Sequence, residues 1–192
     1  WPDESIYSWL ARVSAENASR NKKRVLELSD LLGVNKRIKA VPCFSDEQLI
    51  ALSGLTGTPA MIIENMLWRQ VVSDASKAKF SKQFLFNHRS KVCPICLDKK
   101  EYWTKYWQLL PVTCCCEHGV RLTTACKCGK PILIYPNSII YCDCGRRFSK
   151  QKVIDATDAE IMLTNYILSS PSINSETILA NRLYEVQFCL WY

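Results

Sequence analysis

Four short cysteine motifs follow one another in the middle of the chain. They supply seven cysteines and one histidine: Cys93 and Cys96, Cys115 and His118, Cys126 and Cys128, and Cys142 and Cys144. Thiolates and imidazoles are the ligands that zinc prefers, and a structural zinc ion takes four of them in a tetrahedron. Gaps of one or two residues let neighbouring ligands reach the same ion. The eight ligands therefore predict two structural Zn²⁺ ions.

The order of the motifs allows two ways of pairing them. We favour a sequential pairing, in which the first two motifs bind one ion and the last two bind the other, over a cross-braced pairing. Cys114 and Cys116 flank Cys115, so the ligand register is open by one residue here. Disulfides or unliganded buried thiols are the alternative to metal, and the short spacings in a chain expected to lie in the cytosol argue against them.

Metal sites with four protein ligands leave no position for water or substrate, so we expect both ions to be structural. With His118 assigned to zinc, His88 is the one remaining histidine on which a catalytic site could rest. The sequence contains no GxGxxG or GxxxxGK phosphate loop, and the acids of the middle block form no two-metal cluster. A zinc-dependent nuclease or transposase would need both an open metal position and such acids. We therefore predict that the chain is not an enzyme.

Charge is distributed unevenly along the 192 residues. The chain has 25 Lys and Arg against 18 Asp and Glu, a net charge of +7, and residues 91–152 alone carry 11 basic and 4 acidic groups. A basic middle block favours contact with a polyanion or with an acidic protein face. No apolar run is long enough to cross a membrane and the first residues lack a signal-peptide pattern, so we expect a cytoplasmic protein without membrane contact.

Helical periodicity occurs on both sides of the cysteine-rich block. One helix is expected near the start, with Ile6, Trp9, Leu10 and Val13 on its buried face, and another over about residues 22–32. After the block, Thr157 and Glu160 form a capping-box pattern before a further helix. The sequence thus predicts a mainly α domain over residues 1–91, a tandem zinc-ribbon or zinc-knuckle module over 92–148, and a helical C-terminal segment over 149–192 that we expect to be truncated.

Residues 49–63 have the length and punctuation of a helix-turn-helix. Ser45 and Gln48 form a capping-box pattern ahead of a helix whose expected buried residues are Leu49, Leu52 and Leu55. After the turn, Thr58 is the expected cap of a second helix that begins at Pro59 and reaches about Val72.

This second helix has no Arg or Lys before Arg69. Base reading normally needs polar or basic side chains near the start of the recognition helix. We therefore favour packing or protein contact over base reading for this helix.

Aromatic residues are dense between the halves of the first metal site, at Tyr102, Trp103, Tyr106 and Trp107. With the lysines between them they could stack on the bases of a nucleic acid, but we favour a role in covering the metal module. At the start of the chain, Trp1 and Tyr7 are candidate anchors for a partner protein, because interface anchors are often aromatic.

These residues in combination resemble the TniQ family. The likeness is carried by residues 2–12, which read PDESIYSWLAR, by Cys93-Pro94-Ile95-Cys96, by Tyr102 and Trp107, by Val112-Thr113 before Cys115 with His118-Gly119, and by the Cys-Gly pairs at 128–129 and 144–145. It extends from the first residue to about Phe148. Two positions depart from the family: Cys116 stands where Pro is frequent, and Cys126-Lys127-Cys128 is one residue shorter than the usual CxxC.

The resemblance implies a target-selection adaptor of a DNA transposon. TniQ proteins, and the longer TnsD proteins similar to them, link a target-marking module to the AAA+ ATPase regulator TnsC, which recruits the transposase. The marker is a CRISPR effector complex with guide RNA in CRISPR-associated transposons and attachment-site DNA for TnsD-like members. The resemblance also implies a bacterial protein that lies on the nucleoid when bound to DNA, and it allows a homodimer.

The basic side chains expected to contact nucleic acid are Arg20, Lys22, Lys23, Arg24, Lys36, Arg37, Arg146 and Arg147. The alternative function is a sequence-specific DNA-binding transcriptional regulator that uses the helix-turn-helix and the zinc ribbons. The two functions differ in sequence preference, because a regulator should prefer its own site by ~10³ or more.

Overall fold

Short helices and cysteine-rich loops make up the part of the chain that the structure, a computed structural model, describes: residues 1, 3–16, 44–68, 89–133, 138–168, 182–183 and 185–186. The N-terminal group of helices is α1 (Ile6–Glu16), α3 (Asp46–Thr56) and α4 (Ala60–Asn65). The middle contains α7 (Pro94–Lys99), the 3-10 helices η1 (Lys105–Gln108) and η2 (Phe148–Lys150), and the strands β1 (Cys114–Cys115) and β2 (Val120–Arg121). The last of these elements is α8 (Asp158–Leu168).

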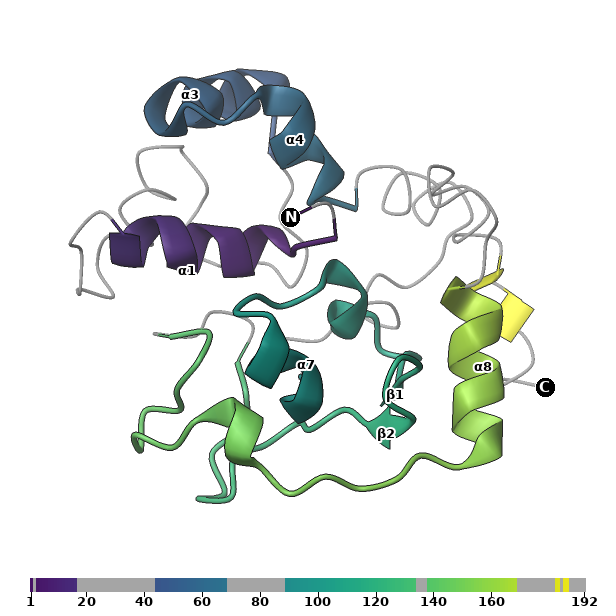
Figure 1. Cartoon of the computed structure of the whole chain (residues 1–192). Helices are drawn as coiled ribbons and strands as arrows, with labels where there is room; N and C mark the ends of the chain where they lie inside the picture. Colours follow the sequence, from purple (N-terminus) through teal and green to yellow (C-terminus); the bar gives the residue numbers. More distant parts are fainter. Residues whose placement is uncertain are drawn as a thin grey trace.

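The elements form three groups that follow the order of the sequence. Figure 1 shows α1 between the α3–α4 pair and the cysteine-rich middle, with α8 along the side of the β1–β2 hairpin. The hairpin is antiparallel, with Cys114 opposite Arg121 and Cys115 opposite Val120. Because α8 also contacts β1, the C-terminal helix covers the hairpin that carries two of the predicted zinc ligands.

Helix α3 begins where the sequence predicts. Ser45 and Gln48 form the expected capping box, and Gly57 ends the helix in the left-handed conformation with φ 69°. Leu49 and Leu52 are buried, but Leu55 is 63% exposed, so its predicted burial is wrong. A spacing of three falls about 60° short of a full helical turn at each step, and Leu55 has therefore rotated away from the buried face.

Helix α4 is shorter than predicted. It begins at Ala60 after Pro59 without a side-chain cap, so Thr58 is not its cap, and it ends at Asn65 rather than near Val72. Met66, Leu67 and Trp68 follow and are all buried. Three consecutive buried side chains do not fit a helix with a single apolar face, and the backbone leaves the helix at this point. A helix-turn-helix that reads DNA stays a prediction.

The N-terminal helices enclose their own small core. Ile6, Trp9 and Leu10 of α1 pack with residues of α3 and α4, as their spacing predicts. Tyr7 is also buried there, at 5% exposure, so the prediction that Tyr7 anchors a partner is wrong. The first four residues of α1, residues 6–9, are all buried. Ile6, Tyr7 and Trp9 belong to this core, whereas Ser8 contacts the cysteine-rich half at Trp103.

A larger core joins the cysteine-rich middle to residues from both sides of it. Its buried members include the cysteines of the first predicted site, Trp103, Trp107, Phe148, Trp68, Ile167, Leu183 and Val186. Packing therefore crosses positions 91 and 148, where the sequence predicts domain boundaries. The predicted capping box of α8 is present, because Thr157 and Glu160 exchange the expected hydrogen bonds.

Some predictions fall on positions outside the described residues. They are the helix over residues 22–32, His88, and the candidate nucleic-acid contacts Arg20, Lys22, Lys23, Arg24, Lys36 and Arg37. Among the residues that are described, no helix has the length and apolar character needed to cross a bilayer.

Candidate metal centres

Cys93, Cys96, Cys115 and His118 converge on one point. Their candidate ligand atoms all lie within 4.8 Å of one another. The Nδ1 atom of His118 lies 3.7 Å from the sulfur of Cys93, 3.3 Å from that of Cys96 and 3.5 Å from that of Cys115. Zinc–sulfur bonds of ~2.3 Å place two tetrahedral sulfur ligands ~3.8 Å apart, so this cluster has the size of a zinc site.

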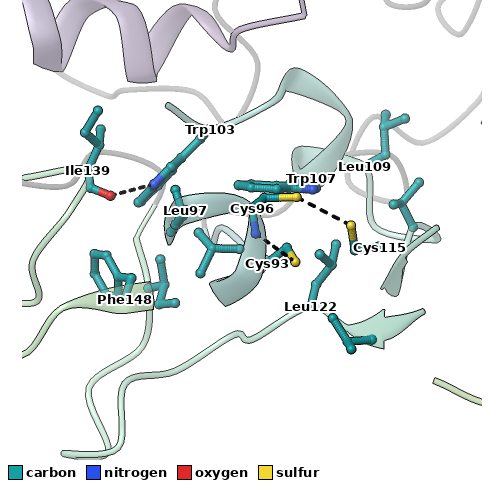
Figure 2. Close-up of a cluster of buried hydrophobic side chains, with 14 of the residues drawn as sticks. Cys93, Cys96, Leu97, Trp103, Trp107, Leu109, Cys115, Leu122, Ile139 and Phe148 are labelled. Carbon is teal, nitrogen blue, oxygen red and sulfur yellow. Dashed lines mark hydrogen bonds between the residues drawn. The ribbon is translucent and has the colours of Figure 1, made fainter. Parts of the chain in front are cut away.

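Local structure places the two cysteines of the first motif. Cys93 is the N-cap of α7, with Pro94 in the first turn. The backbone N–H of Cys96 donates to the sulfur of Cys93 at 3.4 Å. Figure 2 shows these two sulfurs and that of Cys115 in the same buried cluster as Trp103 and Trp107. A helix start that turns its amides toward sulfur favours the thiolate form, which is the form that binds metal.

A lysine holds the second half of the site beside the first. The Nζ atom of Lys91 donates to the carbonyl oxygens of Leu109 at 2.6 Å, Leu110 at 3.0 Å and Val112 at 2.5 Å. Lys91 precedes Cys93, and the loop that it binds leads directly into the strand of Cys115. An ammonium group has three donors, so this contact uses all of them and fixes the loop against the first motif.

The strand β1 decides the ligand register that the sequence left open. Successive side chains of a strand point to opposite sides. Cys115 points into the cluster, whereas the thiol of Cys114 donates to Thr164 Oγ1 at 3.2 Å and to the carbonyl of Glu160 at 3.3 Å in α8. Cys116 is exposed. The structure thus places Cys115, and neither neighbour, at the first cluster.

Hydrogen bonds among the thiols of the first cluster shift the pKa values of Cys93 and Cys96 in opposite directions. The thiols of Cys115 and Cys96 hydrogen-bond to Cys93 and lower its pKa, because they stabilise a thiolate there. The pKa of Cys96 is raised, first by its hydrogen bond with Cys115 and then by Cys93. A partly buried cluster that carries a thiolate attracts a cation, and soft sulfur ligands select zinc or a similar metal.

The second cluster consists of Cys126, Cys128, Cys142 and Cys144, whose sulfur atoms also lie within 4.8 Å of one another. The sulfurs of Cys126 and Cys144 are 3.7 Å apart, as are those of Cys128 and Cys142. The ligand atoms therefore group in the sequential arrangement, with the first two motifs in one cluster and the last two in the other.

Two copies of one turn build this second cluster. In the first copy, the N–H of Cys126 donates to the carbonyl of Lys130 and the N–H of Gly129 donates to Cys126, both at 2.8 Å. In the second copy, Cys142 and Gly145 make the equivalent bonds at 2.9 Å and 2.8 Å. Gly129 and Gly145 have φ values of 87° and 81°, which side chains other than glycine rarely adopt.

Two candidate nucleic-acid contacts, Arg146 and Arg147, lie within the described residues, and they differ in exposure and in their partners. Arg146 is exposed. Arg147 is paired with Glu101 at 3.8 Å, and its guanidinium lies 5.6 Å from the centre of the Tyr141 ring. The aromatic residues between the halves of the first cluster are buried or half-buried, which agrees with their predicted covering role.

Trp1 keeps the exposure that a partner contact requires. Its side chain is 65% exposed, and its ring stacks on that of Tyr102 with centroids 5.5 Å apart.

A polar network at the start of α1 was missed by the sequence analysis. Glu4 is fully buried and accepts hydrogen bonds from Ser8 at 2.9 Å and from Arg12 at 3.0 and 2.8 Å. Ser8 in turn accepts from the backbone N–H of Trp103 at 2.9 Å. Residues Asp3 and Ser5 add backbone bonds to Lys105 and Trp103, each at 2.8 Å. We call Glu4, Ser8, Arg12 and Trp103 the N-terminal latch. The helical spacing of Glu4, Ser8 and Arg12 was the signal that could have revealed it.

Comparison with known protein families identifies the family of this chain. The family model for TniQ matches residues 1–122. The chain belongs to the TniQ family. No curated protein matches it. The matched range of this TniQ protein contains the N-terminal latch and the first cluster, and it ends before Cys126. The family match therefore stops short of Phe148, to which the sequence resemblance was expected to extend.

Proposed function

We propose that this TniQ protein is a non-catalytic adaptor that selects targets for DNA transposition. It would join a target-marking module, either a CRISPR effector with its guide RNA or attachment-site DNA, to the AAA+ ATPase regulator TnsC. The observation that carries the proposal is the family match over residues 1–122, which makes the chain a transposition-associated protein.

The N-terminal latch supports an adaptor role. An adaptor must hold its binding surfaces in a fixed relation, since ordering them on binding would cost affinity. Glu4 and Ser8 are both fully buried and connect α1 to the loop at Trp103. The helical group and the cysteine-rich half are thereby held as neighbours by buried hydrogen bonds, which break only at considerable cost.

We further propose that both clusters hold structural zinc. Each offers four soft ligands at tetrahedral spacing. In the first cluster, His118 would bind through Nδ1, because this nitrogen faces the three sulfurs. Zinc would link segments of the chain that are distant in sequence, and metal binding would add directly to folding free energy.

The alternative function, a sequence-specific transcriptional regulator, finds less support. Helix α4, which would be the recognition helix, has only six residues, and Glu64 is its one charged side chain. Recognition helices use basic or amide side chains for phosphates and base edges.

Binding to the AAA+ ATPase tests the adaptor proposal. Binding of the wild type and of variants to a TnsC-type AAA+ ATPase would be measured by biolayer interferometry, and insertion would be measured in a reconstituted transposition reaction. We expect Trp1→Ala to weaken ATPase binding about tenfold, because an exposed aromatic anchor carries much of a contact's energy. Met162→Ala is the matched control, since Met162 is 71% exposed on α8.

Two results would overturn parts of this proposal. Equal binding by the wild type and Trp1→Ala would remove Trp1 from the interface. No binding to the ATPase, together with a preference of ~10³ or more for one DNA site, would favour the regulator instead.

A further inference from the structure

The two clusters differ in how far their cysteine residues are exposed to solvent. All three cysteines of the first cluster are buried, with exposures of 0% for Cys93, 5% for Cys96 and 7% for Cys115. The His118 side chain is only 10% exposed. In the second cluster, Cys128 and Cys144 are exposed, while Cys126 and Cys142 are buried.

The sulfur of each exposed cysteine also lies close to the sulfur of a buried one. Cys144 is paired with Cys126 and Cys128 with Cys142, each pair with its sulfurs 3.7 Å apart. A disulfide needs its sulfurs at ~2.0 Å, so closing either pair requires a movement of less than 2 Å. The members of each pair come from different turns, and each turn is a short glycine-containing loop rather than part of a helix or sheet.

We propose that the second cluster is a site of oxidative modification, at which a peroxide converts zinc-bound thiolates into the disulfides Cys126–Cys144 and Cys128–Cys142 and releases the ion. The first cluster keeps its zinc under the same conditions. The inference rests on the zinc assignment but not on the transposition role.

The chemistry is balanced with hydrogen peroxide as the oxidant. The exposed thiolate attacks one peroxide oxygen, a sulfur–oxygen bond forms, the oxygen–oxygen bond breaks and hydroxide leaves. The buried thiolate of the pair then attacks the resulting sulfenic sulfur; the disulfide forms and a second hydroxide leaves. Two thiolates are oxidised and one peroxide is reduced for each pair. The four cysteines would then no longer hold zinc, because a disulfide sulfur is not a thiolate ligand.

Access explains why the two clusters should react at different rates. Peroxide must reach a sulfur lone pair, and oxidation of cysteine follows thiolate character and exposure. Zinc-bound sulfurs of both clusters have thiolate character, so exposure is the property that separates them. Trp107, Leu109 and Leu122 belong to the buried core around the first cluster, as Figure 2 shows.

The test uses the full chain loaded with two zinc equivalents. Hydrogen peroxide is added, zinc release is followed with a chromogenic chelator, and remaining thiols are alkylated and located by mass spectrometry. We expect one zinc equivalent to leave about tenfold faster than the other, as differences in cysteine exposure predict. At that point Cys93, Cys96 and Cys115 should still be alkylated, and the peptides of the second cluster should be joined by disulfides. Dithiothreitol with added zinc should restore the metal content.

Two variants keep the test specific. Cys116→Ser removes an exposed thiol that lies outside both clusters, and the zinc release of this variant should match that of the wild type. Cys128→His preserves four ligands but leaves Cys142 without a disulfide partner, so only the Cys126–Cys144 disulfide should form.

Several outcomes would overturn the inference. One is loss of both ions at equal rates, and another is oxidation of Cys93, Cys96 or Cys115 before the cysteines of the second cluster. A third is loss of the faster-leaving zinc equivalent while Cys128 and Cys144 can still be alkylated. Failure of the chain to take up two zinc ions would overturn it as well. None of these results bears on ATPase binding, so the inference and the adaptor proposal can fail separately.

Discussion

Ser8 accepts a hydrogen bond from the backbone N–H of Trp103 at 2.9 Å, across 95 residues of sequence. The same hydroxyl donates to Glu4, whose carboxylate also binds Arg12. Helix α1 is therefore joined to the cysteine-rich half through buried polar groups. These residues lie in the part of the chain that matches TniQ. The N-terminal residues that carry the family resemblance therefore include those that join α1 to the cysteine-rich half.

Breaking the N-terminal latch should destabilise the fold. We expect Ser8→Ala to lower the free energy of unfolding by ~1–3 kcal/mol, because it leaves a buried N–H without an acceptor. Arg12→Met should cost about 3 kcal/mol, because it removes the guanidinium that hydrogen-bonds the buried Glu4 carboxylate. Urea denaturation of zinc-loaded protein measures both. Glu16→Ala is the control: Glu16 is 69% exposed, and its 3.5 Å ion pair with Arg12 should contribute little.

Three adjacent cysteines should respond differently to substitution. Cys115→Ser should lower zinc content from two equivalents toward one, since it removes a ligand of the first cluster. Cys114→Ser and Cys116→Ser should retain both ions. Metal analysis of the folded variants is the measurement. Zinc loss in Cys116→Ser with full retention in Cys115→Ser would place the ligand one residue later.

Lys91 should matter for the first cluster without binding metal. In Lys91→Met the carbonyls of Leu109, Leu110 and Val112 lose their shared donor. We expect a loss of ~1.5–3 kcal/mol in unfolding free energy, the range for hydrogen bonds to charged groups. Competition with a zinc chelator should show weaker binding of one ion only. Lys152→Met, at an exposed position, is the control and should leave both properties unchanged.

Complete removal of zinc should unfold residues 92–148. Zinc binding contributes ~10–16 kcal/mol per site in small metal modules, far more than a core of this size supplies. Treatment with a strong chelator should remove the near-ultraviolet circular dichroism of Trp103 and Trp107. Retention of that signal in protein shown to contain no zinc would contradict the prediction.

The cap of α8 should be sensitive to acid. Hydrogen bonding from the backbone N–H of Thr157, and then Arg121, lowers the pKa of Glu160 below its ordinary value of 4.5. A carboxyl group with a lowered folded pKa stabilises the fold above its unfolded pKa, and this contribution is lost as the pH falls through the folded pKa. Wild type should therefore melt above Glu160→Gln at pH 7, and the difference should shrink below pH 4.5. A constant difference over that range would show that the charge of Glu160 has no role.

Short-range features of the sequence determined much of the candidate site. The gaps of one and two residues between cysteines predicted the two clusters, because a ligand pair so close in sequence can reach one ion without help from the rest of the chain. The caps of α3 and α8 were predictable for the same reason, since a capping box involves residues only three positions apart.

Tertiary structure alone decided which side chains each element turns inward. Helical spacing placed Leu55 with the core and left Tyr7 for a partner, but the packing of α1, α3 and α4 buries Tyr7 and exposes Leu55. The choice of Cys115 over its neighbours depends on the strand direction and on α8 behind Cys114. Burial depends on elements that are distant in the chain, and the spacing of residues within one motif does not specify which distant elements will pack against them.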